Sequence, residues 1–338
     1  MCVAEASRNI AFLAALLLSL ALTNTHALTE NVGQEGRLRA AREEFEAGDY
    51  AKAAQLLRAA SEENPRDGEI HFLLGKTYYE SQEHDAAVAS AEKAVAINPQ
   101  SSLYHEWLGK AYGEKAEHAG MFSALSLAKK ARKEFARAVE LDERNLSAYQ
   151  ALIEFDCSAP GIAGGGEDKA RPEIARVAAL DPAEGHYAEG NCRRQKKDYP
   201  AADAEFAKAL ELHPKSVELL YDIGDHAMKH SQPQVLAMVA EQGEAIAPTD
   251  PRAEFYRAVG WILQKERPDD CERLLRDYLR RAPLRSTFPP PWRAHEWLGR
   301  LYENQQKSQA AIQEYEASLK LDAKNKNARE ALKRLKND

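Results

Sequence analysis

The sequence predicts an all-α array of about eight helix–turn–helix units followed by one capping helix. Small residues recur at a spacing of about 34 residues, a period typical of helical repeat arrays. Ala, Glu, Lys and Leu recur throughout the 338-residue chain, in which 29% of residues are charged and 8% are aromatic. This composition favours soluble helices over sheets. No β-rich segment interrupts the sequence pattern.

The repeat is clearest in two copies. They contain, in order, Leu74, Gly75, Tyr78, Ala87, Ala94 and Pro99, and Gly190, Ala202, Phe206, Ala209 and Pro214. This pattern resembles the tetratricopeptide-repeat family, which places Leu-Gly and Tyr on its first helix, and Ala, an aromatic residue, Ala and Pro on and after its second. The resemblance, to the exported bacterial type, implies a right-handed superhelical solenoid that binds other proteins.

Small residues at matching positions are predicted to bring paired helices into close contact. Glycine on the first helix (helix A) is expected to face alanine on the second (helix B), and the next alanine lets the following repeat dock. The predicted packing residues are Gly75, Ala87, Ala94, Gly109, Ala131, Gly190, Ala202, Ala209, Gly224, Gly299 and Ala311. Overpacking such a site costs about 1–3 kcal/mol, so Ala202→Leu is expected to lower the melting temperature.

The same template predicts the organisation of the chain. The eight copies are expected at residues 34–67, 68–101, 102–145, 146–182, 183–216, 217–250, 251–291 and 292–325. The remaining residues, 326–338, are expected to form a capping helix and tail. The apolar stripe of this helix, Ala328, Ala331, Leu332 and Leu335, suits a cap that covers the last repeat.

The first 27 residues are predicted to be a cleavable signal peptide, followed by a short segment over 28–33. The apolar run over 10–22 is shorter than the roughly 20 residues that span a bilayer. Small residues at Thr25 and Ala27 favour cleavage after Ala27, and an uncleaved anchor is the alternative. We therefore expect a protein exported to the periplasm or secreted, with no membrane span after cleavage.

In the family that this sequence resembles, positions 2, 5, 9, 12 and 13 of each helix A line a concave binding surface. Matching positions predict the partner-binding residues Phe72, Lys76, Tyr79, Glu106, Lys110, Tyr187, Asn191, Arg194, Tyr221, Asp225 and Lys229. Aromatic and charged side chains together suit a groove for an extended peptide or a partner helix. An ordinary hydrated surface is the alternative. The Lys–Asn clamp of chaperone-binding relatives is absent.

Insertions lengthen three copies. The third gains residues 113–122, where Met121 and Phe122 begin an apolar stretch with Leu125 and Leu127 that is expected to pack between lengthened helices. A binding surface is the alternative there.

The fourth copy contains the glycine-rich loop 160–166, read as a flexible connector. A phosphate-binding loop is disfavoured there, because no strand precedes it and acids follow it. The seventh copy ends in three prolines at 289–291, expected to form a stiff spacer, with a docking peptide as the alternative.

Matching stretches that read His-Glu-Trp-Leu-Gly contain Trp107 and Trp297, which are predicted to be core residues. Three cysteines remain after cleavage, Cys157, Cys192 and Cys271, so at least one is unpaired within the chain. A disulfide between the first two is one interpretation, and buried thiols are the other.

Candidate chemistry is sparse. His226 and His230 share a helix face with Asp222, but the Glu that follows the first His in zinc proteases is missing, so no metal site is predicted. No catalytic or cofactor-binding residues are identified, and no cofactor is expected. The formal net charge of −7 argues against nucleic acid as a partner.

The sequence predicts a non-catalytic scaffold for protein partners. A receptor for a small molecule or glycan, using the glycine-rich loop and the groove aromatics, is the alternative.

Overall fold

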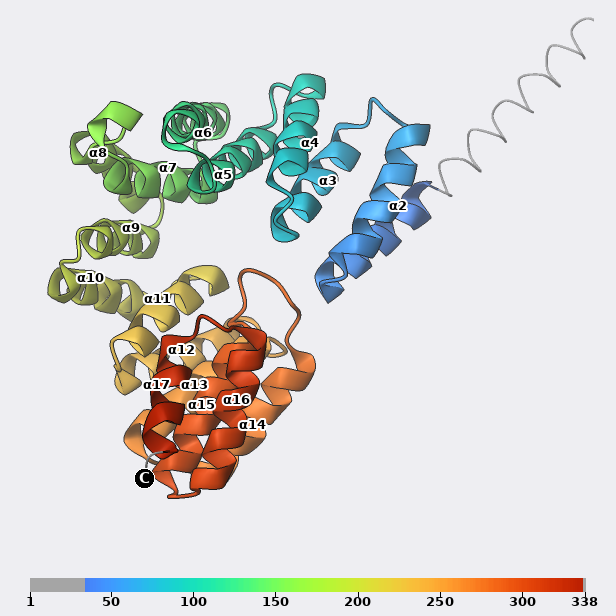
Figure 1. Ribbon diagram of the computed structural model, residues 1–338. Helices are drawn as coiled ribbons and strands as arrows, with labels where there is room; N and C mark the ends of the chain where they lie inside the picture. Colours follow the sequence, from blue (N-terminus) through green and yellow to red (C-terminus); the bar gives the residue numbers. More distant parts are fainter. Residues whose placement is uncertain (1–33, 337–338) are drawn as a thin grey trace, which may run out of the picture. The chain divides into compact units, whose positions relative to one another are not determined.

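The computed structural model describes residues 34–336, which are mainly α-helical and contain no strand (Figure 1). The predicted signal peptide and the segment over 28–33 lie outside the described residues. The chain divides into two compact units, an N-terminal unit (Met1–Pro99) and a C-terminal unit (Gln100–Asp338). None of the helices within 34–336 combines the length and apolar character needed to cross a bilayer.

Two helical hairpins make up the described part of the N-terminal unit. A helix over residues 34–47 precedes α2 (Tyr50–Glu63), and α3 (Gly68–Glu80) packs against α4 (His84–Ile97). The first hairpin is closed by Phe45 and Tyr50, whose rings meet edge to face with centroids 5.5 Å apart. Both hairpins have the antiparallel helix pair that the repeat pattern predicts.

The C-terminal unit continues this arrangement with six hairpins and a final helix (Figure 1). The hairpins are α5 (Ser102–Glu117) with α6 (Met121–Leu141), α7 (Leu146–Ser158) with α8 (Glu167–Leu180), α9 (Pro182–Gln195) with α10 (Tyr199–Glu211), α11 (Val217–Lys229) with α12 (Pro233–Ile246), α13 (Pro251–Gln264) with α14 (Pro268–Arg281), and α15 (Pro291–Asn304) with α16 (Ser308–Leu321). The final helix is α17 (Lys326–Leu335), and a short 3₁₀ turn, η1 (Gly161–Ala163), lies between α7 and α8.

The predicted fold class, helical hairpins in a repeat array with a terminal helix, is confirmed. On α17, Ala328, Ala331 and Leu332 are buried against Tyr302 and Tyr315 of the last hairpin. The predicted limits of the individual copies stay a prediction.

Local sequence signals explain where helices begin. Side chains of Asp67, Ser101, Asn145 and Ser216 accept hydrogen bonds from free backbone N–H groups in the first turn of the helix that follows each. Proline occupies the first turn of α9, α10 and α12 to α15, where its missing N–H costs nothing.

Glycines on the first helix of a pair allow close contact, but mostly with an aromatic ring rather than with alanine. A Cβ at Gly109 would lie 2.5 Å from the ring of Phe135, and one at Gly299 would lie 2.6 Å from Tyr315. Gly190 faces Phe206 of the same hairpin in this way, and Gly224 faces Tyr256 on α13, the first helix of the next hairpin. The expectation of glycine facing alanine is therefore wrong at these four positions. The space left by the missing Cβ is filled by a ring edge.

Among the predicted packing glycines, Gly75 alone faces small residues. Its Cβ would lie 3.3 Å from the backbone of Ala91 and 3.5 Å from that of Ala87. The predicted packing alanines are all buried: Ala87, Ala94, Ala131, Ala202, Ala209 and Ala311. The predicted packing positions that carry alanine therefore lie in the core of the hairpins.

The insertion in the third copy lengthens both of its helices, to 16 residues in α5 and 21 in α6. Its apolar residues do not all pack between them, however. Leu125 and Leu127 are half-buried, whereas Met121 is 83% and Phe122 is 90% exposed. The expectation of interhelical packing is therefore wrong for Met121 and Phe122, whose side chains face solvent at the start of α6.

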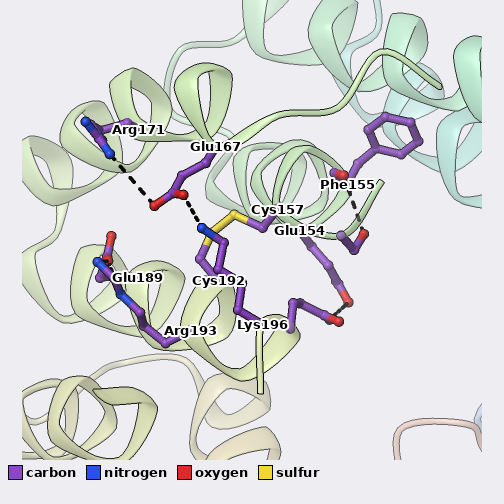
Figure 2. Close-up of a disulfide and its surroundings, with 11 residues drawn as sticks. Glu154, Phe155, Cys157, Glu167, Arg171, Glu189, Cys192, Arg193 and Lys196 are labelled. Carbon is purple, nitrogen blue, oxygen red and sulfur yellow. Dashed lines mark hydrogen bonds and ion pairs between the residues drawn. A yellow bond between two sulfur atoms is a disulfide. The ribbon is translucent and has the colours of Figure 1, made fainter. Parts of the chain in front are cut away.

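A disulfide joins Cys157 at the end of α7 to Cys192 near the end of α9, with the two Cα atoms 5.2 Å apart (Figure 2). The sequence left open whether these two cysteines form a disulfide or are buried free thiols. The structure contains the disulfide. Cys271 is the free thiol among the described residues; it is buried, and burial raises the pKa of its sulfhydryl to about 12. Such a thiol is unreactive at neutral pH.

The glycine-rich loop is a hydrogen-bonded turn rather than an unstructured connector. Gly166 N–H donates to the carbonyl of Asp156 at 2.8 Å, and the side chain of Ala163 is buried. Positive φ angles at Gly164 and Gly166 are readily adopted only by glycine. After the loop, Glu167 pairs with Arg171 and Lys196 (Figure 2).

Candidate protein-binding groove

Two neighbouring pockets in the C-terminal unit form a groove along the first helices of its repeats. The first, the acidic pocket, has a volume of about 630 Å³ and is lined by residues of α5, α7, α9, α11 and α13 and of the segment before α15. Its charged side chains are Lys110, Glu154, Glu184, Glu218, Asp222 and Asp225. Glu218, Asp222 and Asp225 pair with Arg252, Arg194 and Arg293. Glu154 and Glu184 have no cationic hydrogen-bond partner among the described residues, so they make this end of the groove attractive to cations.

Tyrosines form much of the apolar wall of the acidic pocket. The rings of Tyr221 and Tyr256 stack with centroids 5.4 Å apart, and Tyr256 Oη donates to Asp225 Oδ1 at 3.0 Å. Tyr187 Oη donates to Asp222 Oδ2 at 3.1 Å. Burial raises the pKa of Tyr187 and of Tyr256, so both hydroxyls stay protonated as donors.

Two of the carboxylates in the acidic pocket have, among the described residues, only amide groups as side-chain hydrogen-bond partners. Gln150 Nε2 donates to Glu184 Oε2 at 3.0 Å, and Gln195 Nε2 lies 3.4 Å from Glu154 Oε1. Burial raises the pKa of Glu184 despite the hydrogen bond from Gln150. An arriving cation would relieve this cost, because an opposite charge stabilises the ionised carboxylate.

The second pocket, the basic pocket, has a volume of about 960 Å³ and lies among α9, α11, α15 and the turn before α17. Its charged side chains are Arg194, Lys197, Lys229, Arg293, Arg300, Lys324 and Lys326, with Asp222, Asp225, Glu296 and Asp322. Four of the cations, Lys197, Lys229, Lys324 and Lys326, are exposed and form no salt bridge within residues 34–336. Tyr199 and Trp292 add half-buried ring surface beside them.

Two ion pairs mark the boundary between the pockets, which share Asp222 and Asp225. Asp222 Oδ2 lies 2.9 Å from Arg194 Nη1, and Asp225 Oδ1 lies 3.0 Å from Arg293 Nη1. Charge along the groove therefore changes from acidic, through two neutralised pairs, to basic.

The segment with three prolines forms one wall of the acidic pocket. Arg252 is almost fully buried between the rings of Tyr221 and Phe288, 4.4 and 4.3 Å from their centroids, and donates to the carbonyl of Thr287. Tyr278 Oη donates to the carbonyl of Pro289 at 2.5 Å. The segment thus packs on its own repeat, and Thr287 lines the pocket.

Six of the predicted partner-binding residues line the groove. Lys110, Tyr187, Tyr221 and Asp225 line the acidic pocket, and Arg194, Asp225 and Lys229 line the basic pocket. The other two from this unit, Glu106 and Asn191, are buried and line neither. Tyr221 is only 3% exposed and belongs mainly to the hydrophobic core. Phe72, Lys76 and Tyr79 lie on α3 of the N-terminal unit, where Lys76 Nζ is 5.6 Å from the centre of the Phe72 ring.

Glu106 joins α5 to the start of α7 through hydrogen bonds and does not line the groove. Its carboxylate accepts from Lys110 at 2.5 Å, Ser147 at 2.6 Å and Asn145 at 3.0 Å. Burial alone would raise the pKa of Glu106, but Lys110 and the two hydrogen-bond donors together lower it.

The groove residues of the eighth copy were missed from the sequence. Arg293, Glu296 and Arg300 all line the basic pocket. They occupy positions 2, 5 and 9 of a copy that starts at residue 292, so the rule applied to the other repeats would have found them. Lys324, in the turn before α17, and Lys326, the first residue of α17, have no such signal.

The paired histidines of α11 lie in the basic pocket with other partners. His226 Nε2 is 2.7 Å from Asp203 Oδ1, and the rings of His226 and His230 are 4.4 Å apart. Burial lowers the pKa of His226. Asp222, the acid one turn earlier, pairs with Arg194.

The glycine-rich loop lines a different pocket from the groove aromatics. Gly161, Ile162 and Gly164 face a pocket of about 490 Å³ beside α6, which shares no lining residue with the acidic or basic pocket. Among the described residues, the glycine-rich loop and the groove aromatics therefore line separate pockets.

Two segments of the chain, residues 44–111 and 263–334, match family models. Both models describe the tetratricopeptide repeat. The tetratricopeptide-repeat family, which generally mediates protein–protein interactions, is thus supported near both ends of the array. No curated protein sequence matches the chain.

Solved structures similar to this chain include several tetratricopeptide-repeat proteins. One from Thermus thermophilus is 23% identical, with 55% of this chain and 94% of that protein covered at a TM-score of 0.46. One from Parabacteroides merdae is 11% identical, with 89% and 98% covered at 0.42. A chain of the Cut9–Hcn1 hetero-tetramer of the APC/C is 17% identical, with 88% and 55% covered at 0.49.

Proposed function

We propose that this protein is an exported, non-catalytic scaffold that binds a segment of a partner protein in the groove of its C-terminal unit. The observation that carries the proposal is the charge division of that groove. Five carboxylates, one lysine and three tyrosines line one pocket. Seven cations and four carboxylates line the next, and two of these carboxylates are shared with the first pocket. Aromatic anchors flanked by charge are typical of protein-binding surfaces, and opposite charges at two ends fix the direction of a bound segment.

The bound segment is expected to have basic residues at one end and acidic residues at the other. Its basic end would lie near Glu154 and Glu184, which have no cationic hydrogen-bond partner among the described residues. Its acidic end would lie near Lys229 and Lys324. An extended peptide or a helix satisfies this requirement equally, because both present side chains along a line.

Export is supported by two features. The N-terminal apolar run has the length and small-residue ending of a signal peptide. The disulfide between Cys157 and Cys192 is typical of oxidising compartments such as the periplasm or the cell exterior. N-terminal sequencing of the protein recovered from the periplasm or medium tests this, since cleavage predicts a first residue of Leu28.

The groove is tested by affinity capture from the envelope fraction of the native host with charge-reversal variants. Lys229→Glu/Lys324→Glu inverts the basic pocket. The control, Lys215→Glu/Lys320→Glu, changes net charge equally at exposed lysines that line no groove pocket. We expect one enriched protein that wild type and control retain and the groove variant loses.

Direct titration of the captured protein then distinguishes binding from indirect recovery. The groove variant should weaken binding by at least about tenfold, and added salt should weaken the wild type. Equal affinity of groove and control variants would contradict the proposal. A small ligand that stabilises the wild type, with no protein enriched, would favour the receptor alternative.

A further inference from the structure

A strongly basic pocket lies outside the groove, between α6 and the glycine-rich loop. Lys129, Arg132, Lys133 and Lys169 line it, and none of its lining residues is acidic. The whole chain has a formal net charge of −7, so this local excess of cations is not a consequence of overall composition. A surface of this kind attracts anions.

Two of the four cations are fixed by the loop and its surroundings. Arg132 forms a two-point pair with Asp156, at 2.7 and 2.9 Å, and Lys169 Nζ donates to the carbonyl of Gly164 at 2.5 Å. Lys129 and Lys133 are exposed and form no ion pair within the described chain. The pocket therefore has a rigid base and two lysines whose charge is available.

Large apolar side chains are exposed on the same two elements. Ile162 of η1, which lines the pocket, is 72% exposed, and Phe122 at the start of α6 is 90% exposed. Phe122 precedes Lys129 by seven residues and Lys133 by eleven, so all three lie on one face of the helix. The next acid on that helix face, Glu140, lies beyond the pocket lining and pairs with Arg137.

We propose that this α6–loop face, comprising Phe122, Lys129, Lys133, Ile162 and Lys169, docks onto an anionic phospholipid surface. Lysines near a membrane are attracted by anionic headgroups, and apolar side chains between them enter the headgroup–acyl boundary. A free phosphate would account for the lysines but not for the exposure of Phe122 and Ile162. The combination of unpaired cations with protruding apolar groups favours the lipid surface.

The α6–loop face is separate from the groove. Its pocket shares no lining residue with the acidic or basic pocket, so membrane docking and partner binding need not compete for a side chain. A protein held in this way would present its groove at a membrane surface.

Vesicle co-sedimentation of the chain from Leu28 onward, which contains every described helix and lacks the apolar N-terminal run, tests the proposal. We expect binding to phosphatidylglycerol–phosphatidylcholine vesicles and little to phosphatidylcholine alone. Lys129→Gln/Lys133→Gln should weaken binding about tenfold or more, since each lysine near an anionic surface contributes independently. Lys215→Gln/Lys320→Gln, which removes the same charge elsewhere, should bind as wild type does.

The apolar part has its own test. Phe122→Ser/Ile162→Ser keeps the charge and should also weaken vesicle binding, and its unchanged circular dichroism would show that it folds. Equal binding by all variants, or equal binding to neutral vesicles, overturns the proposal. Stabilisation by inorganic phosphate without vesicle binding would overturn it in favour of a free anion. Groove capture is unaffected by either result, so the two proposals can fail separately.

Discussion

The third and eighth repeats share the five residues His-Glu-Trp-Leu-Gly, and in both the histidine ties its helix to the second helix of the same hairpin. His105 Nδ1 lies 2.6 Å from Glu134 on α6, and His295 Nδ1 lies 2.7 Å from Glu314 on α16. The same local sequence thus makes the same local contact in two distant parts of the chain.

The glutamates of the two stretches also match. Glu106 accepts from Asn145 Nδ2 at 3.0 Å, and Glu296 accepts from Asn325 Nδ2 at 2.8 Å. Each asparagine caps the next helix, α7 in one case and α17 in the other. The capping helix therefore docks through the contact by which an ordinary repeat docks.

The tryptophans differ. Trp297 is 3% exposed, and its Nε1 donates to the sulfur of Met228 on α11 at 3.2 Å. Trp107 is only half-buried, with Lys110 Nζ 4.9 Å from its ring centre. The histidine and glutamate contacts, which lie within a hairpin or reach the next helix, are the same wherever this local sequence occurs. Burial of the tryptophan differs, because Trp297 contacts Met228, 69 positions away in the sequence.

Truncation of the tryptophans should give the largest difference between the two repeats. Trp297→Ala is expected to lower the free energy of unfolding by about 3–5 kcal/mol, because it leaves a cavity in the core. Trp107→Ala should cost clearly less, since its ring is already partly in water. Urea unfolding followed by circular dichroism measures both, and equal losses would show that the burial difference is unimportant.

The glycines of the two stretches should respond alike. Gly109→Ala and Gly299→Ala each place a Cβ against a ring and should cost about 1–3 kcal/mol of unfolding free energy. Gly113, one turn later on α5, has no neighbouring atom within 4 Å of the place that a Cβ would occupy, so Gly113→Ala should instead stabilise by about 0.5–1 kcal/mol. Thermal melts of the three variants decide. If Gly113→Ala were destabilising, the assumption that alanine favours the helix at this position would be wrong. The expected cost of ring contact at Gly109 and Gly299 would not be affected.

Acid should weaken the ion pair and the hydrogen bonds that the Glu106 carboxylate makes. Its lowered pKa means that its ionised form stabilises the fold above the unfolded-state pKa, and that this contribution is lost as pH falls through the folded pKa. Glu106→Gln should cost about 1–2 kcal/mol at pH 7, because hydrogen bonds to a charged acceptor are stronger. Unfolding measured from pH 7 to pH 3 should show the gap between wild type and variant closing below about pH 5. A gap independent of pH would rule out the ion pair with Lys110 as its source.

The smallest effects concern the cations over the two indole rings. Arg300 lies 4.1 Å from the ring centre of Trp297, and Arg300→Gln should cost about 0.5–1 kcal/mol. Lys110→Gln should cost more, because it also leaves the buried carboxylate of Glu106 without its cation. Chemical unfolding at low and high salt measures the loss of unfolding free energy in both variants. A larger loss for Arg300→Gln than for Lys110→Gln would contradict the role of Lys110 as the cation that pairs with Glu106.

Several features followed from short-range sequence alone. The hairpin period, the positions that must stay small and the apolar stripe of α17 each act within one hairpin or on its neighbour. These features can therefore be predicted from about 34 consecutive residues. The match between the two His-Glu-Trp-Leu-Gly stretches is of the same kind.

The candidate groove could be predicted only in part. The family positions found Lys110, Arg194 and Lys229, which the structure places in its pockets. They also selected Glu106 and Asn191, which are buried. Position along a helix gives the approximate face of a side chain, but whether that face meets solvent depends on the helix stacked beside it.

By itself the sequence determined an all-helical repeat array, the spacing of its hairpins and the residues that let paired helices approach. Only the tertiary structure decided that Cys157 meets Cys192, that Trp297 reaches Met228 and that charge divides along the groove. These features join residues from different repeats. They depend on the rotation between successive hairpins, which the summed packing of many side chains sets and no single repeat specifies.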